Sequence, residues 1–135
     1  MARILVIEYD PDVRTLLLML LQRAGHSVRG VPSGMRGLEL MADIQPDLVL
    51  VSLELPVMNG WSVLRQARAD HQLRRVPLIA MTTQPTPAYR IQAILAGFQD
   101  VITKPFQIDT LLQSVTVLAP PQEPPPFVPS CILTC

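Results

Sequence analysis

One lysine, Lys104, occurs in the whole chain, and it stands among polar residues that each follow a short apolar segment. The segments and the polar residues after them are 4–7 with Glu8, Tyr9 and Asp10, 48–51 with Ser52, 78–81 with Thr82, and 101–103 with Lys104. In an open parallel α/β sheet, the carboxyl ends of the strands beside the switch in strand order form the binding crevice, so these side chains should converge there. Carboxylate, hydroxyl and ammonium groups gathered in this way suit ion binding or nucleophilic chemistry.

Ser52 and Lys104 raise the possibility of a serine–lysine nucleophilic pair. A serine hydroxyl is a weak nucleophile unless a base activates it. No oxyanion-type glycine loop follows Ser52, and Leu53 to Pro56 offers no cluster of free backbone donors for an oxyanion. We therefore expect that the chain is not an enzyme.

The apolar periodicity predicts five strands that alternate with five helices. The expected strands are 4–7, 27–31, 48–53, 76–81 and 101–103. The helix starts and stops include Asp10 as a cap before Pro11, Ser33 as a second cap, and Gly25 and Gly97 as terminators. Since crossovers between parallel strands are nearly always right-handed, the prediction is a doubly wound five-stranded parallel sheet, order 2-1-3-4-5, in a three-layer α/β sandwich.

Four of the five expected helices carry apolar residues at spacings of three or four, which predicts one buried face on each. These residues are Val13, Leu16, Leu17, Leu20, Leu21 and Ala24, then Met35, Leu38 and Met41, then Trp61, Leu64 and Ala67, and finally Ile108, Leu111, Leu112 and Val115.

Composition narrows the classes of function. The 135 residues are 49% hydrophobic, which suits one domain, expected at 1–118. Eleven basic and eleven acidic residues cancel, so we expect neither nucleic-acid nor membrane-surface binding, and protein partners are favoured. No apolar run approaches the roughly 20 residues of a membrane span, and no secretion signal is evident, so a cytoplasmic location is expected.

Cysteine and histidine suggest no metal site. Cys131 and Cys135 both fall in the last five residues, so the body has no cysteine framework. His26 and His71 lack a second ligand at metal spacing and are expected to be solvated. Residues 119–135 contain six prolines and no apolar period, which predicts a disordered tail or linker; a ligand for a proline-recognising domain is the alternative.

Five motifs in order give the chain a specific resemblance. The motifs are the first strand with its acidic cluster, Pro46 to Val51, Leu55 to Gly60, Pro77 to Thr82, and Asp100 to Phe106. In order and spacing they resemble the receiver domain of two-component response regulators, the CheY-like family with a flavodoxin-like fold, over residues 2–118. The resemblance implies a phosphoryl-accepting aspartate, two acidic residues that hold Mg²⁺, a hydroxyl residue, a lysine and a following proline.

Several of these positions depart from the family pattern. Thr82, Lys104 and Pro105 match, and Glu8 keeps the first acidic position. Three positions differ: Tyr9 replaces the second acidic residue, Ser52 replaces the acceptor aspartate, and Val101 stands at the aromatic switch position. We expect Ser52 to be inert toward a phosphodonor and Mg²⁺ binding to be lost or weak. Lys104 should pair with Glu8 near Ser52, and the Tyr9 ring should fill space vacated by metal.

The favoured hypothesis is a degenerate receiver, or pseudo-receiver, that signals by protein interaction without phosphorylation. The resemblance implies contact through the fourth helix, last strand and fifth helix, as a possible homodimer as well; the candidate residues there are Tyr89, Ile94, Gln107 and Thr110. One alternative is a phosphorelay receiver that accepts phosphate on Asp10, Glu54 or Ser52. The other is a flavodoxin-like small-ligand-binding protein, which lacks a glycine-rich phosphate loop after the first strand.

Overall fold

Strands and helices alternate along the chain in the computed structural model, which describes residues 2–84, 86–105 and 107–118. The elements are β1 (Arg3–Ile7), α1 (Pro11–Arg23), β2 (Ser27–Val31), α2 (Gly34–Ile44), β3 (Leu48–Ser52), α3 (Gly60–Ala69), β4 (Leu78–Thr82), α4 (Pro87–Ala96), β5 (Asp100–Thr103) and α5 (Ile108–Leu118). The expected tail at 119–135, with Cys131 and Cys135, lies outside the described residues.

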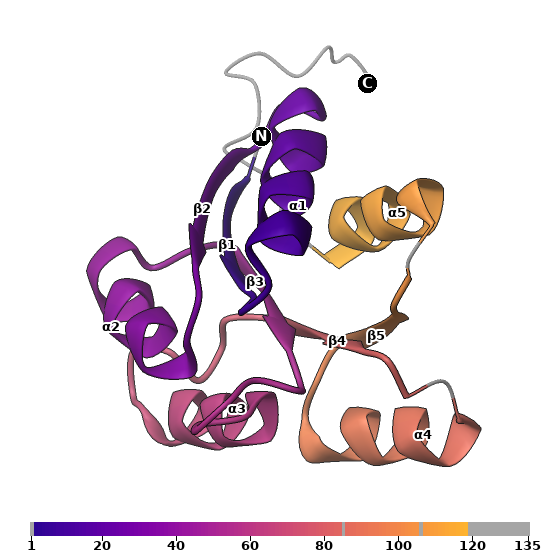
Figure 1. The fold of residues 1–135 in the computed structure, drawn as a ribbon. Coiled ribbons are helices and arrows are strands. Elements are labelled where there is room, and N and C mark those ends of the chain that lie inside the picture. Colours follow the sequence, from indigo (N-terminus) through magenta and orange to yellow (C-terminus); the bar gives the residue numbers. More distant parts are fainter. Residues whose placement is uncertain (1, 85, 106, 119–135) are drawn as a thin grey trace, which may run out of the picture.

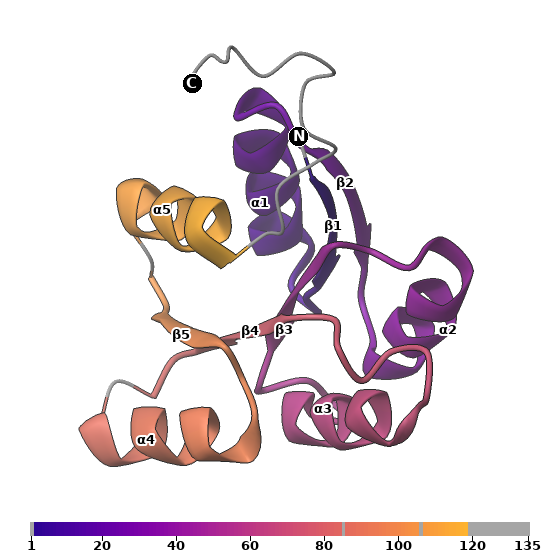
Figure 2. The same cartoon turned by 180° about the vertical axis from the view of Figure 1, so that it is seen from behind.

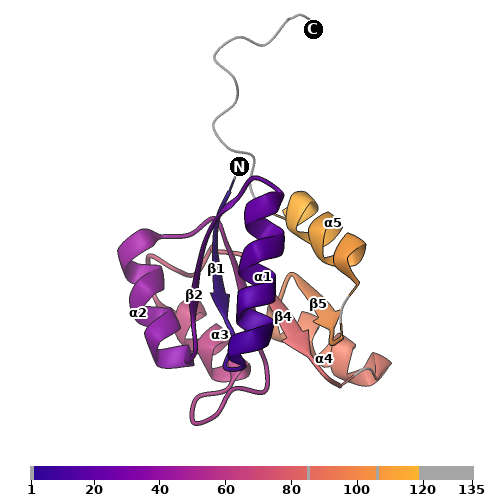
Figure 3. The ribbon, with the colours of Figure 1, turned by 45° about the horizontal axis from the view of Figure 1, so that its top comes forward.

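The five strands form one parallel sheet in the order β2-β1-β3-β4-β5, which confirms the predicted doubly wound topology. Helices α1 and α5 cover one face, and α2, α3 and α4 cover the other (Figures 1 and 2). Figure 3 shows α1 and α5 side by side on their shared face. This arrangement places every strand-to-helix loop at the carboxyl edge of the sheet.

Alternate residues of each strand enter different cores on the two faces. In β1, Leu5 and Ile7 join the core beneath α2, α3 and α4, whereas Ile4 and Val6 join the core beneath α1 and α5. All five residues of β3 are buried, because it is the middle strand and is covered on both faces. Ser52, the last residue of this strand, is therefore held rigidly.

Helix starts follow the capping chemistry in the sequence. The Asp10 carboxylate accepts hydrogen bonds from the backbone N–H groups of Asp12 at 2.8 Å and Val13 at 3.4 Å, and Pro11 opens the helix. Asn59 and Thr86 cap α3 and α4 in the same way. Each cap fixes where a helix begins after a loop of the carboxyl edge.

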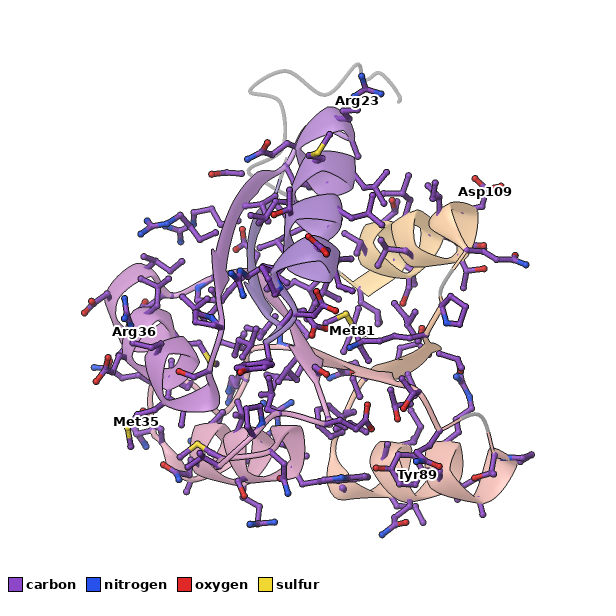
Figure 4. The ribbon with its side chains drawn as sticks, in the orientation of Figure 1. Arg23, Met35, Arg36, Met81, Tyr89 and Asp109 are labelled. Carbon is purple, nitrogen blue, oxygen red and sulfur yellow. The ribbon has the colours of Figure 1, made fainter. Side chains whose placement is uncertain are left out.

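Four residues expected on buried helix faces are exposed, and one of them is Ala24, the C-cap of α1. Leu16, Met35 and Ile108 are exposed to 46%, 62% and 49%. Leu17, next to Leu16, takes the position facing the sheet. Met35 and Ile108 lie in the first turns of α2 and α5, and Figure 4 shows Met35 pointing outward. Periodicity identified the helices correctly but made the buried stripe too wide.

The histidine expectation is half right. His71 is exposed, as expected. His26 is instead half-buried, and its Nδ1 accepts a hydrogen bond from the backbone N–H of Ala2 at 3.0 Å. Burial, together with the positive chain terminus, lowers the pKa of His26 and favours the neutral ring that accepts this bond. His26 therefore ties the loop between α1 and β2 to Ala2, the residue before β1.

Gly60 is a close contact between α3 and the end of β3. A Cβ added there would lie 2.6 Å from the Ser52 carbonyl oxygen and 2.8 Å from Leu53 Cα. The Gly60 N–H also donates to the Leu53 carbonyl at 3.1 Å. Because both nearest atoms belong to the backbone, a side chain at this position would displace the segment that holds Ser52.

We predict that Gly60→Ala lowers the free energy of unfolding by about 1–3 kcal/mol, as overpacking does. The sign of this change identifies close packing as its cause, because alanine at an unhindered helix position stabilises the fold by about 0.5–1 kcal/mol relative to glycine. Urea unfolding of the variant measures the change, with Gln66→Ala on the exposed side of α3 as the control. A Gly60→Ala protein as stable as the parent would contradict the close packing.

Candidate functional site

Lys104 lies at the centre of the polar residues on the carboxyl edge. Its ammonium donates to Glu8 Oε1 at 2.5 Å and to Ser52 Oγ at 3.0 Å. The lysine follows β5, Glu8 follows β1, and Ser52 ends β3, so one cation joins three strands of the sheet. The expected pairing of Lys104 with Glu8 is confirmed.

This ion pair is shielded from water. The side chains of Lys104 and Glu8 are exposed to 15% and 5%, so removing either partner would strand a charge with little solvation. The second oxygen of Glu8, Oε2, accepts the backbone N–H of Asp10 at 3.1 Å. Both carboxylate oxygens therefore have a donor from the protein itself.

Glu8 and Asp10, the two carboxylates that follow β1, have different roles. Glu8 joins the buried cluster, whereas the Asp10 carboxylate caps α1 and is exposed. Arg14 holds the loop between them, because its guanidinium donates to the carbonyl oxygens of Glu8 at 2.8 Å and Tyr9 at 3.3 Å. The acidic pocket expected from the sequence therefore contains one carboxylate in contact with Lys104.

The expectation for Tyr9 is wrong. Its side chain is 61% exposed and borders an apolar cavity of about 370 Å³ between the loops that follow β1, β2 and β3. None of Glu8, Ser52 and Lys104 lines this cavity, so the ring does not fill space beside them. The phenol ring instead lies beside the prolines and methionines of the neighbouring loops, which offer an apolar surface that the charged cluster lacks.

Glu54 is the residue whose role sequence reasoning missed. Buried Thr82 donates its hydroxyl to Glu54 Oε2 at 2.6 Å, and the Thr83 N–H donates to Glu54 Oε1 at 3.2 Å. The Thr82 hydroxyl also accepts the Gln84 N–H at 3.0 Å. Glu54 thus links the loop after β3 to the loop after β4. The available signal was a carboxylate two residues after a buried strand, facing a Thr-Thr pair at the end of the next.

Val101 and Pro105 complete the expected positions. Val101 is 5% exposed and packs in the core beneath α2, α3 and α4, while its carbonyl accepts from Arg90 at 2.8 Å. The Val101 side chain has no hydrogen-bonding group, so it could form no hydrogen bond if it moved to the surface. Pro105 directly follows Lys104 and is exposed.

The described residues contain neither a cluster of metal ligands nor a membrane-spanning helix. Within 2–84, 86–105 and 107–118, no three or more His, Cys, Asp or Glu side chains form a group able to hold a metal ion. Among the same residues, no helix has the length and apolar character needed to cross a membrane.

The chain resembles proteins of two-component signalling along most of its length. Residues 4–116 match the family described as response regulator receiver domain. The chain is 33% identical over 118 residues to the DNA-binding dual master transcriptional regulator RpaA of Synechocystis sp., which covers 87% of this chain and 49% of that protein. It is 30% identical over 118 residues to protein PilH of Pseudomonas aeruginosa, with coverage of 87% and 98%.

A solved structure supports the same assignment. The receiver domain of a Pseudomonas aeruginosa sensor histidine kinase, which holds a magnesium ion in its active-site cleft, is 30% identical with a TM-score of 0.80, covering 87% of this chain and 97% of that one. The chain spans about half the length of RpaA. From its matched residues and its fold, this chain belongs to the response regulator receiver family.

Proposed function

We propose that this chain is a pseudo-receiver, a two-component signalling module that acts through protein contacts without phosphorylation. The observation that carries the proposal is the Lys104 ammonium shared between Glu8 and Ser52. In this arrangement the buried cation already has its counter-charge, and the residue at the acceptor position is a neutral hydroxyl. The cluster is complete without an added phosphoryl group or cation.

The chemistry of Ser52 supports this proposal. A carboxylate is ionised at neutral pH and attacks phosphorus directly, whereas a hydroxyl needs a base to remove its proton. The group that contacts the Ser52 hydroxyl is the Lys104 ammonium, which donates to it. An ammonium paired with a carboxylate is protonated and cannot serve as that base.

The two alternative acceptors are engaged elsewhere. The Asp10 carboxylate caps α1, and the Glu54 carboxylate holds Thr82 and Thr83. Phosphorylation of either would require breaking these bonds, each of which compensates backbone or buried polar groups. This engagement favours the pseudo-receiver over a relay with a displaced acceptor.

We further propose that Mg²⁺ binding is lost or weak. Mg²⁺ is usually held by one or two carboxylates together with waters and phosphate oxygens. Glu8 is the carboxylate in the Lys104 cluster, and the Lys104 ammonium already neutralises its charge. Tyr9, at the second acidic position, supplies no carboxylate, and its side chain is exposed. The residues present therefore do not fit the cation that the related histidine-kinase receiver holds.

Partner contact is proposed on the face formed by α4, β5 and α5. Ile94, Gln107 and Thr110 are exposed there, and Ile94 belongs to an apolar group on α4 with Ile91 and Leu95, exposed to 58% and 81%. The other candidate, Tyr89, is half-buried, and its ring packs edge-on against Trp61 of α3. A homodimer through the same surface is part of this proposal.

Incubation with acetyl phosphate and Mg²⁺ tests the acceptor chemistry. We expect the parent protein to gain no phosphate by intact-mass spectrometry, because Ser52 lacks a base. The double variant Tyr9→Asp/Ser52→Asp, treated identically, should gain one and shows that the conditions are adequate. A phosphate on the parent chain, mapped to Asp10, Glu54 or Ser52, would support the relay alternative.

Titration with Mg²⁺ tests the cation site separately. The thermal midpoint and the fluorescence of Trp61, the single tryptophan, should not respond in the parent protein. The same double variant introduces carboxylates at positions 9 and 52 and should be stabilised by Mg²⁺, by about 1.4 kcal/mol at ten times its dissociation constant. Saturable stabilisation of the parent would refute the loss of Mg²⁺ binding.

Removing the buried cation tests the cluster itself. Lys104→Met should lower the free energy of unfolding by about 3–5 kcal/mol, because Glu8 is left buried and unpaired. The double variant Glu8→Gln/Lys104→Met should lose less, since no charge remains. Arg90→Gln breaks the more exposed pair with Asp100 and should cost about 1 kcal/mol or less. Equal losses in the Lys104 and Arg90 variants would show that the cluster is solvated.

A further inference from the structure

A groove lies between α3 and α4, away from the Lys104 cluster. It encloses about 410 Å³ and is lined by Trp61, Leu64, Arg65, Arg68 and Ala96. Trp61 is fixed in place, because its ring packs edge-on against Tyr89 and Phe98 with centroid separations of 5.6 and 5.7 Å. The groove therefore combines a rigid apolar floor with two guanidinium groups.

Arg68 is a half-buried cation without a carboxylate partner in the described part of the chain. Its guanidinium donates to the carbonyl oxygens of Val76 at 2.8 Å and Gly97 at 3.3 Å. Burial lowers the pKa of Arg68, which reports the cost of desolvating this charge. The carboxyl end of α4 offers a partial negative charge of about one half, so the compensation is incomplete.

Three further arginines add positive charge along the same stretch of chain. Arg65, Arg74 and Arg75 are exposed, and no ion pair involves them within the residues the structure describes. Arg65 donates to the Ser62 hydroxyl on its own helix, and Arg75 directly precedes Val76, whose carbonyl binds Arg68.

Acidic residues nearby do not balance this charge. Asp70 is the one acidic residue between Gly60 and Pro77, and its carboxylate accepts the Gln72 N–H at 2.8 Å. Helix α4 contributes none. The chain as a whole is neutral, so residues 60–77 and α4 together carry a local excess of positive charge.

We infer that this groove binds an acidic peptide segment of a protein partner, with one aliphatic or aromatic side chain seated against Trp61 and Leu64. Carboxylates of the segment would meet Arg65 and Arg68, the two arginines that line the groove, for which guanidinium geometry is well suited. Nucleic acid is a weaker candidate, because strand binding uses bases stacked on aromatic rings, and Trp61, the one aromatic side chain among the described residues lining the groove, packs edge-on against its neighbours.

The test uses Trp61 fluorescence with a short blocked peptide of aspartate and glutamate around one central leucine, and a second peptide with glycine in its place. The leucine peptide should bind saturably and about tenfold more tightly than the glycine peptide. Its affinity should fall as salt rises from about 0.02 M to about 0.5 M.

Paired variants separate the groove from general charge. Arg65→Glu reverses a charge that lines the groove and should weaken binding of the leucine peptide by about tenfold. Arg36→Glu makes the same charge change in another groove, which Glu39 and Asp43 also line, and should leave binding unchanged. Arg36 lies on α2, on the far side of the molecule from α4 (Figure 4).

Three outcomes would overturn the inference. They are no saturable response to the leucine peptide, equal weakening by Arg65→Glu and Arg36→Glu, and tighter binding of a single-stranded oligonucleotide than of the peptide. None of these readouts depends on Ser52 or on Mg²⁺, so failure here is distinguishable from failure of the pseudo-receiver proposal.

Discussion

The buried ion pair between Lys104 and Glu8 is the constraint on which the carboxyl edge of the sheet depends. The parallel sheet brings the ends of β1, β3 and β5 together, and a charge placed there can be kept out of water only if another charge neutralises it. Glu8 supplies that charge, and the Ser52 hydroxyl accepts a second hydrogen bond from the Lys104 ammonium. The side chains at this edge therefore neutralise and hydrogen-bond the Lys104 ammonium.

Asp10 and Glu54, the other carboxylates considered at this edge, accept hydrogen bonds from the backbone and from the Thr82 hydroxyl. Asp10 satisfies the first N–H groups of α1, and Glu54 bridges the loops after β3 and β4 through Thr82 and Thr83. A carboxylate that accepts several protein donors is stabilised where it stands and is costly to move. These loops are therefore held by carboxylates that accept hydrogen bonds from backbone N–H groups and from the Thr82 hydroxyl.

Comparison of sequence and structure shows where pattern reasoning succeeds. Apolar runs, caps and terminators placed all five strands and helices, because local backbone preference and burial agree along this chain. Leu16, Met35 and Ile108 were misassigned because periodicity gives the direction of a helix face and not its width. Tyr9 was misplaced because a residue next to a cluster in sequence can turn either way, and only neighbouring loops decide which surface its ring contacts.

By itself, the sequence determined the topology, the family resemblance and the convergence of Glu8, Ser52 and Lys104. It could do so because strand order and right-handed crossovers bring strand ends together whatever the side chains are. Only the tertiary structure decided which donors each carboxylate accepts, and it alone revealed the partnership of Glu54 with Thr82 and the groove beside Trp61. Those features join residues from separate loops and helices, whose distances depend on how the elements pack and are not encoded in any local pattern.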